Sequence, residues 1–329
     1  MAAVGNLNPT LIDVASRTQD GEIMDIVELL NETNEIIPDA TWIEANDGTG
    51  HKTTVRSGLP SVAWRLLNYG VQPSKSTTVQ IKDACGMLEA YAEVDKALAD
   101  LNGNTAAFRL SEDRAFLEAM NQAFADTLIY GNTNTNPERF LGLAPRFSTK
   151  SGAENGENII LGGGSGANNT SIWLAVWGPN TLHCIYPKGS KAGLQSRDLG
   201  EQTLFDANGG RYQGYRTHYK WDPGLTLRDW RYVVRIANVD VTALTKNASA
   251  GADLIDLMVQ ALETIPNLGM GRPVFYCNRT IRSFLRRQIT NKSNVHLSME
   301  EVAGKKVVMF DSVPVRKVDS ILNTEATVA

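Results

Sequence analysis

The sequence has few cysteines and no long apolar run, which excludes several protein classes. Its three cysteines, Cys85, Cys184 and Cys277, are widely spaced and form no CxxC pair. This argues against a disulfide framework and against a thiolate zinc site. No stretch of 18 apolar residues occurs, and the N-terminus lacks a basic segment followed by an apolar one. We therefore expect a soluble cytoplasmic chain with reduced thiols and no contact with a membrane.

Motifs for catalysis and for cofactor binding are also missing. The chain has four histidines, which stand singly and form no HExxH motif: His51, His183, His218 and His296. The glycine-rich stretch 162–166 lacks the GK[ST] ending of a phosphate loop, and Ser165 does not fit the GxSxG pattern of a hydrolase. The sequence therefore predicts no enzyme activity, no cofactor and no metal.

Each of two neighbouring stretches is almost free of charge of one sign. Residues 1–50 hold ten acids and one base, Arg17, a net charge of −9, within a chain whose total is −4. Residues 51–82 hold no acid and five bases: Lys52, Arg56, Arg65, Lys75 and Lys82. A net acidic chain is a poor candidate for a dedicated nucleic-acid binder. We expect the two blocks to attract each other between copies of the chain, within a Debye length of about 8–10 Å.

The N-terminal third reads as an arm followed by a hairpin. Apolar residues at helical spacing from Ile23 to Leu30 predict a short helix that ends before Pro38. Thr- and Val-rich stretches at 52–56 and 77–82, separated by Gly and Pro residues, predict a long polar β-hairpin. Its flanks are too polar to form a core alone. The hairpin is either an ordinary surface feature or an extension that is completed on a neighbouring subunit.

A long helix is predicted over residues 111–131, with Ser111 as N-cap and Gly131 after its last turn. Its apolar stripe runs from Phe116 to Leu128 and predicts core packing. The next block, 159–240, is rich in β-branched and aromatic residues and predicts one broad sheet. Its expected strands are 172–176, 182–186, 214–219 and 230–237.

The C-terminal 80 residues alternate between helix and strand patterns and predict a compact α/β unit. Two charged stripes follow its two expected helices. The first helix carries the acids Asp253, Asp256 and Glu263, and the second carries the bases Arg279, Arg282 and Arg286. One interpretation is that both stripes are solvated faces or pair within one chain, where an exposed ion pair contributes only about 0–1 kcal/mol. The alternative hypothesis is that the stripes meet between neighbouring copies around a rotation axis and set their register.

Several stretches resemble those of one protein family. They are residues 53–70 with QPSKS at 72–76, NPERFLGLAPRF at 136–147, YPKGSKAGL at 186–194, and VPVRKVD at 313–319. Together with the order of the segments, they resemble the major capsid proteins of tailed, podovirus-type double-stranded DNA bacteriophages. The resemblance spans nearly the whole chain and rests on ordered segments rather than on one diagnostic motif.

The resemblance implies an α+β chain with the Hong Kong-type capsid fold. By analogy, residues 1–45 are the N-terminal arm and 46–95 the extension loop. Residues 96–240 are the peripheral domain with the spine helix 111–131, and 241–329 are the axial domain. The β-rich block precedes the last helical unit, whereas the family places the last peripheral strands at the C-terminus. The chain would then be a variant with rearranged connectivity, and the strand order stays open.

The resemblance also implies a function. The chain would self-assemble into hexamers and pentamers that form an icosahedral shell around packaged double-stranded DNA, which it contacts non-specifically. Expected partners are further copies of itself, a scaffolding protein, a portal and a cement or decoration protein. It would assemble in the host bacterial cytoplasm and reside in the virion. The alternatives are an encapsulin-like nanocompartment shell, a glycan- or nucleotide-processing enzyme built on the sheet at 151–240, and a DNA-binding module.

Overall fold

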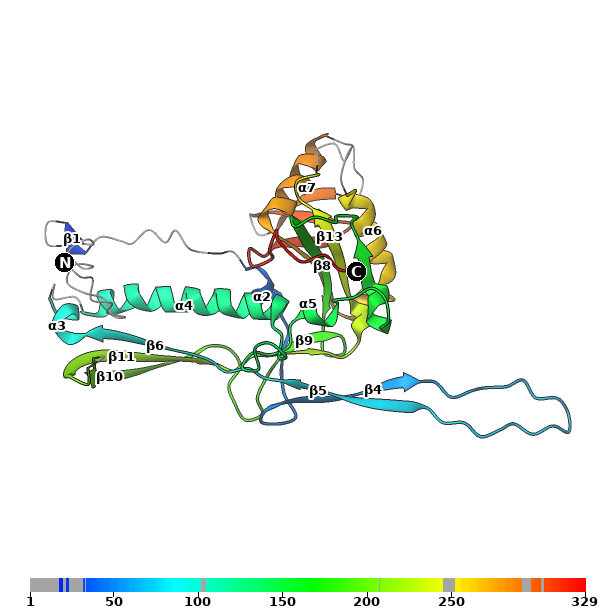
Figure 1. Cartoon of the computed structure of the whole chain (residues 1–329), viewed down its shortest axis with the longest axis horizontal. Coiled ribbons are helices and arrows are strands. Elements are labelled where there is room, and N and C mark those ends of the chain that lie inside the picture. Colours follow the sequence, from blue (N-terminus) through cyan, green and yellow to red (C-terminus); the bar gives the residue numbers. More distant parts are fainter. Residues whose placement is uncertain are drawn as a thin grey trace.

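The fold is α+β and has two parts at an angle to each other. The computed structural model describes residues 18–19, 22–23, 32, 34–101, 105–206, 208–244, 252–291, 297–302 and 305–329. One part is an upright unit built on a large sheet (Figure 1). The other is a long bar, formed by a helix and three strands on one side of the upright unit, and a hairpin projects on the opposite side (Figure 1). No helix in the described ranges is long and apolar enough to cross a membrane.

The upright unit is built on a ten-stranded sheet with β8 (Asn169–Trp177) at its centre. All nine residues of β8 are buried, and the strand pairs antiparallel with both β13 and β14. The other strands are β3 (Trp42–Glu44), β7 (Ile159–Leu161), β9 (Leu182–Tyr186), β12 (Gly224–Leu227), β13 (Val233–Asp240), β14 (Arg272–Cys277), β15 (Leu297–Val302), β16 (Lys305–Phe310) and β17 (Val313–Lys317). Because β8 is buried on both faces, its residues 172–177 are apolar without a break.

The two faces of the sheet are covered by different elements. Side chains alternate along β8, so that Leu174 and Trp173 belong to two separate buried clusters. Helices α6 (Leu254–Thr264) and α7 (Arg279–Asn291) pack over the Leu174 face. The end of α4 and the turn α5 (Leu143–Arg146) pack over the Trp173 face.

The bar consists of helix α4 (Thr105–Tyr130) and a three-stranded antiparallel sheet. The strands are β6 (Leu88–Asp95), β10 (Gln195–Phe205) and β11 (Arg211–Trp221), in the order β10-β11-β6. At 26 residues α4 spans about 39 Å. It starts six residues before the predicted N-cap, so Ser111 lies inside the helix. The earlier start is explained by Phe108, which is buried in a small cluster with Val94 and Leu98 and anchors the first turn.

The predicted end of this helix is confirmed. Tyr130 is its last residue, and Gly131 follows. A Cβ on Gly131 would lie 2.4 Å from the carbonyl oxygen of Phe140 and 2.5 Å from that of Thr127. Only glycine therefore allows the chain after α4 to pass this close to residues 140–142.

The predicted hairpin is confirmed as β4 (Gly50–Gly58) and β5 (Thr77–Ala84), which pair antiparallel from Gly50 opposite Ala84 to Gly58 opposite Thr77. The range expected for the extension also contains β6, which instead pairs with β11 in the bar. The remaining short elements are β1 (Thr18–Gln19), β2 (Glu22–Ile23), α2 (Ile36–Asp39), α3 (Lys96–Ala99) and the 3-10 turns Glu154–Asn158, Trp230–Tyr232 and Leu268–Met270.

Three sequence expectations need correction. The strands of block 159–240 do not form one sheet: β11 belongs to the bar, while β8, β9 and β13 belong to the ten-stranded sheet. That sheet also contains β14 to β17, so it crosses the expected boundary at residue 240. Ile23 lies in β2, and Pro38 lies inside the single turn α2; the rest of the expected arm helix, up to Leu30, lies outside the described residues.

Candidate assembly surfaces

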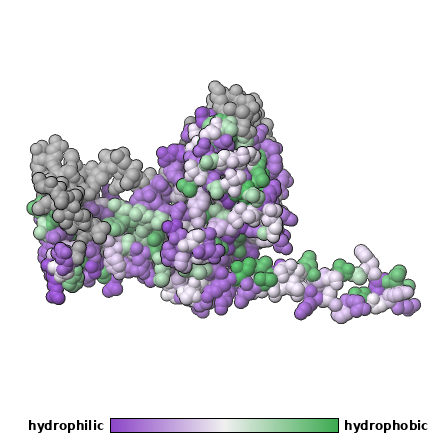
Figure 2. Space-filling model, viewed as in Figure 1, coloured by the Kyte–Doolittle hydropathy of each residue, from purple (hydrophilic) through white to green (hydrophobic). Residues whose placement is uncertain are grey.

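The tip of the extension hairpin, residues 59–76, is an apolar segment in contact with water. Trp64 is fully exposed, Val62 is 92 % exposed and Leu67 is 85 % exposed. The other exposed large apolar residues of the tip are Leu59, Leu66, Tyr69 and Val71. Figure 2 shows apolar side chains spread along this projecting segment. Such clusters on soluble proteins mark interaction surfaces, because burying one large apolar side chain is worth about 1.5–3 kcal/mol.

The five bases of the hairpin are also exposed. Lys52, Arg56, Arg65, Lys75 and Lys82 all point into solvent, and none forms an ion pair with another described residue. Lys82 contacts only the hydroxyl of Thr49, at 3.5 Å. The hairpin is therefore both positively charged and apolar. Sequence reasoning found the charge but described the hairpin as polar, although the seven large apolar residues between Gly58 and Pro73 were a readable signal.

The base of the hairpin is fixed to the body by buried polar contacts. Asp83 Oδ1 lies 2.7 Å from Arg146 Nη2, with the two side chains only 4 % and 11 % exposed. Arg146 Nη2 also donates to the carbonyl oxygen of Leu225, and Gly86 N donates to that of Pro223. A buried ion pair with further hydrogen bonds has a defined geometry, and this one sets the direction in which the hairpin leaves the body.

Two histidines next to this ion pair are held neutral. His51, on β4, lies with Nε2 3.1 Å from Arg228 Nη2. Burial lowers the pKa of His51, and the neighbouring Arg228 lowers it further. Burial likewise lowers the pKa of His183, 5.9 Å away between ring centres, to about 4, with Arg228 and His51 adding to the shift. Both imidazoles at the hairpin base are therefore uncharged at neutral pH.

The two charged stripes lie on α6 and α7, as the spacing predicted. Asp253 is the N-cap of α6 and accepts hydrogen bonds from the backbone of Ile255 and Asp256. Asp256 and Glu263 are exposed on the same helix. Figure 1 shows α6 and α7 as two separate helices of the upright unit, and both cover the Leu174 face of its sheet. That the two stripes meet between neighbouring copies stays a prediction.

The basic stripe is partly used within the chain. Arg279 Nη2 lies 2.9 Å from Asp319 Oδ2, and Arg282 Nη1 lies 3.5 Å from Glu35 Oε2. Neither arginine pairs with the acids of α6. Together with Lys317, the basic side chains of α7 line an open groove of about 570 Å³: Arg279, Arg282, Arg286 and Arg287.

The described end of the arm lies on the same basic face. Besides the contact with Arg282, Glu35 Oε2 accepts a hydrogen bond from the backbone N of Lys317 at 2.7 Å. Asp39 Oδ2 lies 3.3 Å from Arg316, and burial raises the pKa of Asp39 while Arg316 opposes that shift. These two acids of the 1–50 block thus bind residues 282 and 316–317 rather than the hairpin. The expected attraction between the blocks of neighbouring copies stays a prediction.

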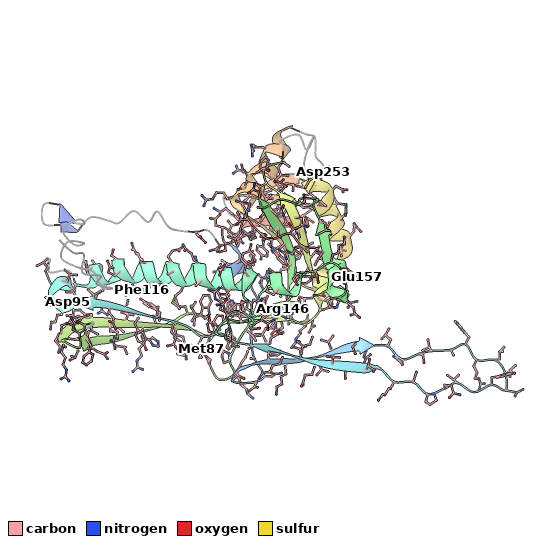
Figure 3. All side chains as sticks on the ribbon, viewed as in Figure 1. Met87, Asp95, Phe116, Arg146, Glu157 and Asp253 are labelled. Carbon is pink, nitrogen blue, oxygen red and sulfur yellow. The ribbon has the colours of Figure 1, made fainter. Side chains whose placement is uncertain are left out.

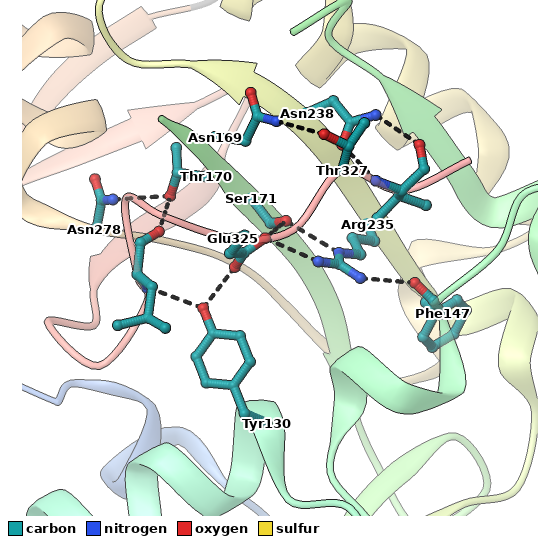
Figure 4. A network of polar contacts seen from close by, with 12 residues as sticks. Tyr130, Phe147, Asn169, Thr170, Ser171, Arg235, Asn238, Asn278, Glu325 and Thr327 are labelled. Atoms are coloured by element: carbon teal, nitrogen blue, oxygen red, sulfur yellow. Dashed lines mark hydrogen bonds and ion pairs between the residues drawn. The ribbon is translucent and has the colours of Figure 1, made fainter. Parts of the chain in front are cut away.

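The C-terminal segment is tied into the core by a buried polar network that sequence reasoning missed (Figure 4). Glu325 Oε2 lies 2.8 Å from Arg235 Nη2 and also accepts a hydrogen bond from Ser171. Glu325 Oε1 accepts a hydrogen bond from Tyr130 Oη at 2.5 Å. Arg235 Nη1 donates to the carbonyl oxygen of Phe147. The network joins α4, β8, β13 and the C-terminus. The Glu325 carboxylate is already paired with Arg235, so it is not a free base that could activate Ser171 as a nucleophile.

Comparisons with known proteins agree with this architecture. A family model described as "Major capsid protein GP7" matches residues 18–329. The capsid structure of bacteriophage Epsilon15 is 45% identical, covers 100% of this chain and 99% of its own, and has a TM-score of 0.79. The bacteriophage JBD30 capsid has the same fold at 10% identity, with coverage of 97% and 96% and a TM-score of 0.50.

Other comparisons carry less weight. The SrpI encapsulin complex of Synechococcus elongatus is 12% identical, covers 72% of this chain and 99% of its own, and has a TM-score of 0.45, which is too low to support the encapsulin alternative. No curated protein matches the sequence. The family match over residues 18–329 and the full-length likeness to the Epsilon15 capsid protein show that this chain belongs to the GP7 family of tailed-bacteriophage major capsid proteins.

Proposed function

We propose that this capsid protein acts by binding copies of itself, as hexamers and pentamers that close an icosahedral shell around packaged double-stranded DNA. The observation that carries the proposal is the extension hairpin. Its tip exposes seven large apolar side chains, and its five bases have no acidic partner among the described residues. An exposed apolar cluster of this kind marks a surface that another molecule covers. In a shell of identical copies, the covering molecule is a neighbouring subunit.

The two parts of the fold suit two positions in such a shell. The peripheral domain comprises α4 with β6, β10 and β11, and the axial domain comprises the ten-stranded sheet with α6 and α7. This division moves β7, β8, β9, β12 and β13 from the expected peripheral domain to the axial one, because they share a sheet with β14 and β17. The residues of the arm described from 34 onward lie against the axial unit.

The charged helices supply a contact around the capsomer axis. Helices α6 and α7 both cover the Leu174 face of the sheet, and the three acids of α6 are exposed. We place α6 of one copy against α7 of the next. A contact between two different surfaces of identical chains repeats head to tail, and it closes into a ring when the rotation from one copy to the next divides a full turn. Charge in such a contact sets register and partner choice more than affinity.

The shell requires partners that the chain itself does not supply. A separate scaffolding protein would direct curvature, a portal would occupy one vertex, and a cement protein would bind the finished lattice. The virion is the final location of a capsid protein, and we place its assembly in the host bacterial cytoplasm. Packaged DNA would be contacted non-specifically, through phosphate charge.

Electron microscopy of the chain co-expressed with its scaffolding protein tests the proposal. Closed shells with pentameric and hexameric capsomers are expected. A chain that stays monomeric or dimeric under all such conditions would contradict it. A variant that lacks residues 59–76 serves as the control, and it should fold but fail to close shells.

A further inference from the structure

A small pocket lies where the extension hairpin joins the body. It has a volume of about 260 Å³ and is lined mainly by apolar side chains of four segments: Met87 and Leu88, Ala123 and Phe124, Phe140, and Pro223. Phe124 and Phe140 are buried, whereas Met87 is 76 % exposed at the rim. Figure 3 shows Met87 at the junction of the hairpin and the bar. A liquid water occupies about 30 Å³, so the pocket is large enough to take one aromatic ring in place of several waters.

Two charged residues stand at the rim of this pocket, and one of them forms no ion pair with another described residue. Arg139 Nη1 is paired with Asp126 Oδ2 at 2.9 Å. The neighbouring Glu138 is exposed, and its carboxylate contacts only the side-chain amide of Asn136, at 3.4 Å. The pocket thus combines an apolar floor with an acidic group at its edge, and it suits an aromatic side chain that stands next to a base.

The hairpin tip presents this combination. Trp64 is fully exposed, and Arg65 directly follows it in the chain and is exposed as well. Trp and Arg are the residues most often found as anchors in protein interfaces. Of the five hairpin bases, Arg65 is the one adjacent to a tryptophan.

The occupant of the pocket must come from a second copy. Trp64 lies fourteen positions after Gly50, which is at the hairpin base, and at about 3.3 Å per residue this extended segment spans up to roughly 45 Å. Figure 1 shows the hairpin extending away from the body, so the tip cannot return to the pocket of its own chain. A tip-to-base contact joins two different surfaces, and repeated around an axis it closes a ring.

We infer that Trp64 of one subunit inserts into the pocket formed by Met87, Phe124 and Phe140 of its neighbour, and that Arg65 then lies beside Glu138. This inference rests on the proposed function, because it needs neighbouring copies. It adds the residues that receive the extension. It also gives the apolar side chains of the tip a binding site, which an attraction between charges alone would not require.

Cysteine cross-linking tests the inference without removing the apolar anchor. Arg65→Cys and Glu138→Cys are combined in a Cys85→Ser background, since Cys85 lies close to the pocket while Cys184 and Cys277 are buried. Oxidised shells should give a ladder of covalent oligomers on a non-reducing gel. The matched control combines Glu138→Cys with Arg56→Cys, which is exposed on the hairpin stem, and it should give no ladder.

A second pair of variants guards against failed assembly of the cysteine protein. Arg65→Glu should raise the protein concentration needed for assembly at least tenfold. Adding Glu138→Arg should bring that concentration most of the way back to the value of the unmodified chain. Trp64→Ala should weaken assembly more than Val79→Ala, which removes an exposed apolar side chain from the stem. Closed shells without a ladder, or a double charge reversal that restores nothing, would overturn the docking site alone. The absence of shells from the unmodified chain would instead overturn the proposed function.

Discussion

Replacing Glu325 with glutamine should destabilise the folded chain by about 3–5 kcal/mol, the usual cost of removing one partner from a buried ion pair. The side chains of Arg235 and Glu325 are 6 % and 4 % exposed, so the guanidinium left behind would have almost no access to water. Glutamine keeps the size of the side chain but removes the charge. Its amide nitrogen can neither accept the hydrogen bond from Tyr130 nor complete the pair with Arg235.

The matched control is the double variant Arg235→Met with Glu325→Leu, which replaces the pair by apolar side chains. Buried pairs replaced in this way often cost little, so the double variant should be less destabilised than the sum of the two single variants. The measurement is urea unfolding of the unassembled chain, followed by tryptophan fluorescence, since the Arg235 guanidinium lies 5.1 Å from the Trp173 ring. A loss below about 1 kcal/mol for Glu325→Gln would refute the view that this network secures the C-terminus.

Three further predictions concern charge. Replacing Lys52, Arg56 and Lys75 together by Gln should raise the protein concentration needed for assembly. Salt near 1 M should do the same, because the Debye length falls to about 3 Å. If light scattering shows that neither change affects assembly, the charge blocks have no role in it. Reversing Arg282 and Arg286 to Glu should block assembly while the circular dichroism of the monomer stays unchanged, and normal assembly of this variant would exclude the α6–α7 contact. His183, whose pKa is about 4 when folded against about 6.5 when unfolded, contributes stability that is complete above about pH 6.5 and is lost as the pH falls toward 4. The free energy of unfolding should fall by about 3 kcal/mol across this pH range. In His183→Leu it should depend less steeply on pH. An equally steep pH dependence in that variant would contradict the role given to His183.

The elements that sequence reasoning placed correctly are those fixed by local patterns. The hairpin strands follow from Thr- and Val-rich stretches between glycines, and the end of α4 follows from Gly131, where no side chain fits. The start of α4 was predicted wrongly because a serine followed by acids mimics an N-cap. Burial of Phe108, a tertiary contact, extends the helix past that signal.

The features that the sequence did not predict depend on distant residues. β8 pairs with β14 across about a hundred residues, so an alternating pattern could not show that the sheet crosses residue 240. Arg235 and Glu325 are likewise 90 residues apart and carry no motif. The spacing on α7 placed its arginines on one face, but only the fold shows that Glu35 and Asp319 occupy two of them.

The most direct test of the central claim is a reconstruction of the assembled shell at side-chain resolution. The account predicts that residues 59–76 of each subunit lie on a neighbouring subunit, with Trp64 buried against it. Extension tips that stay in solvent, or that fold back onto their own chain, would contradict it.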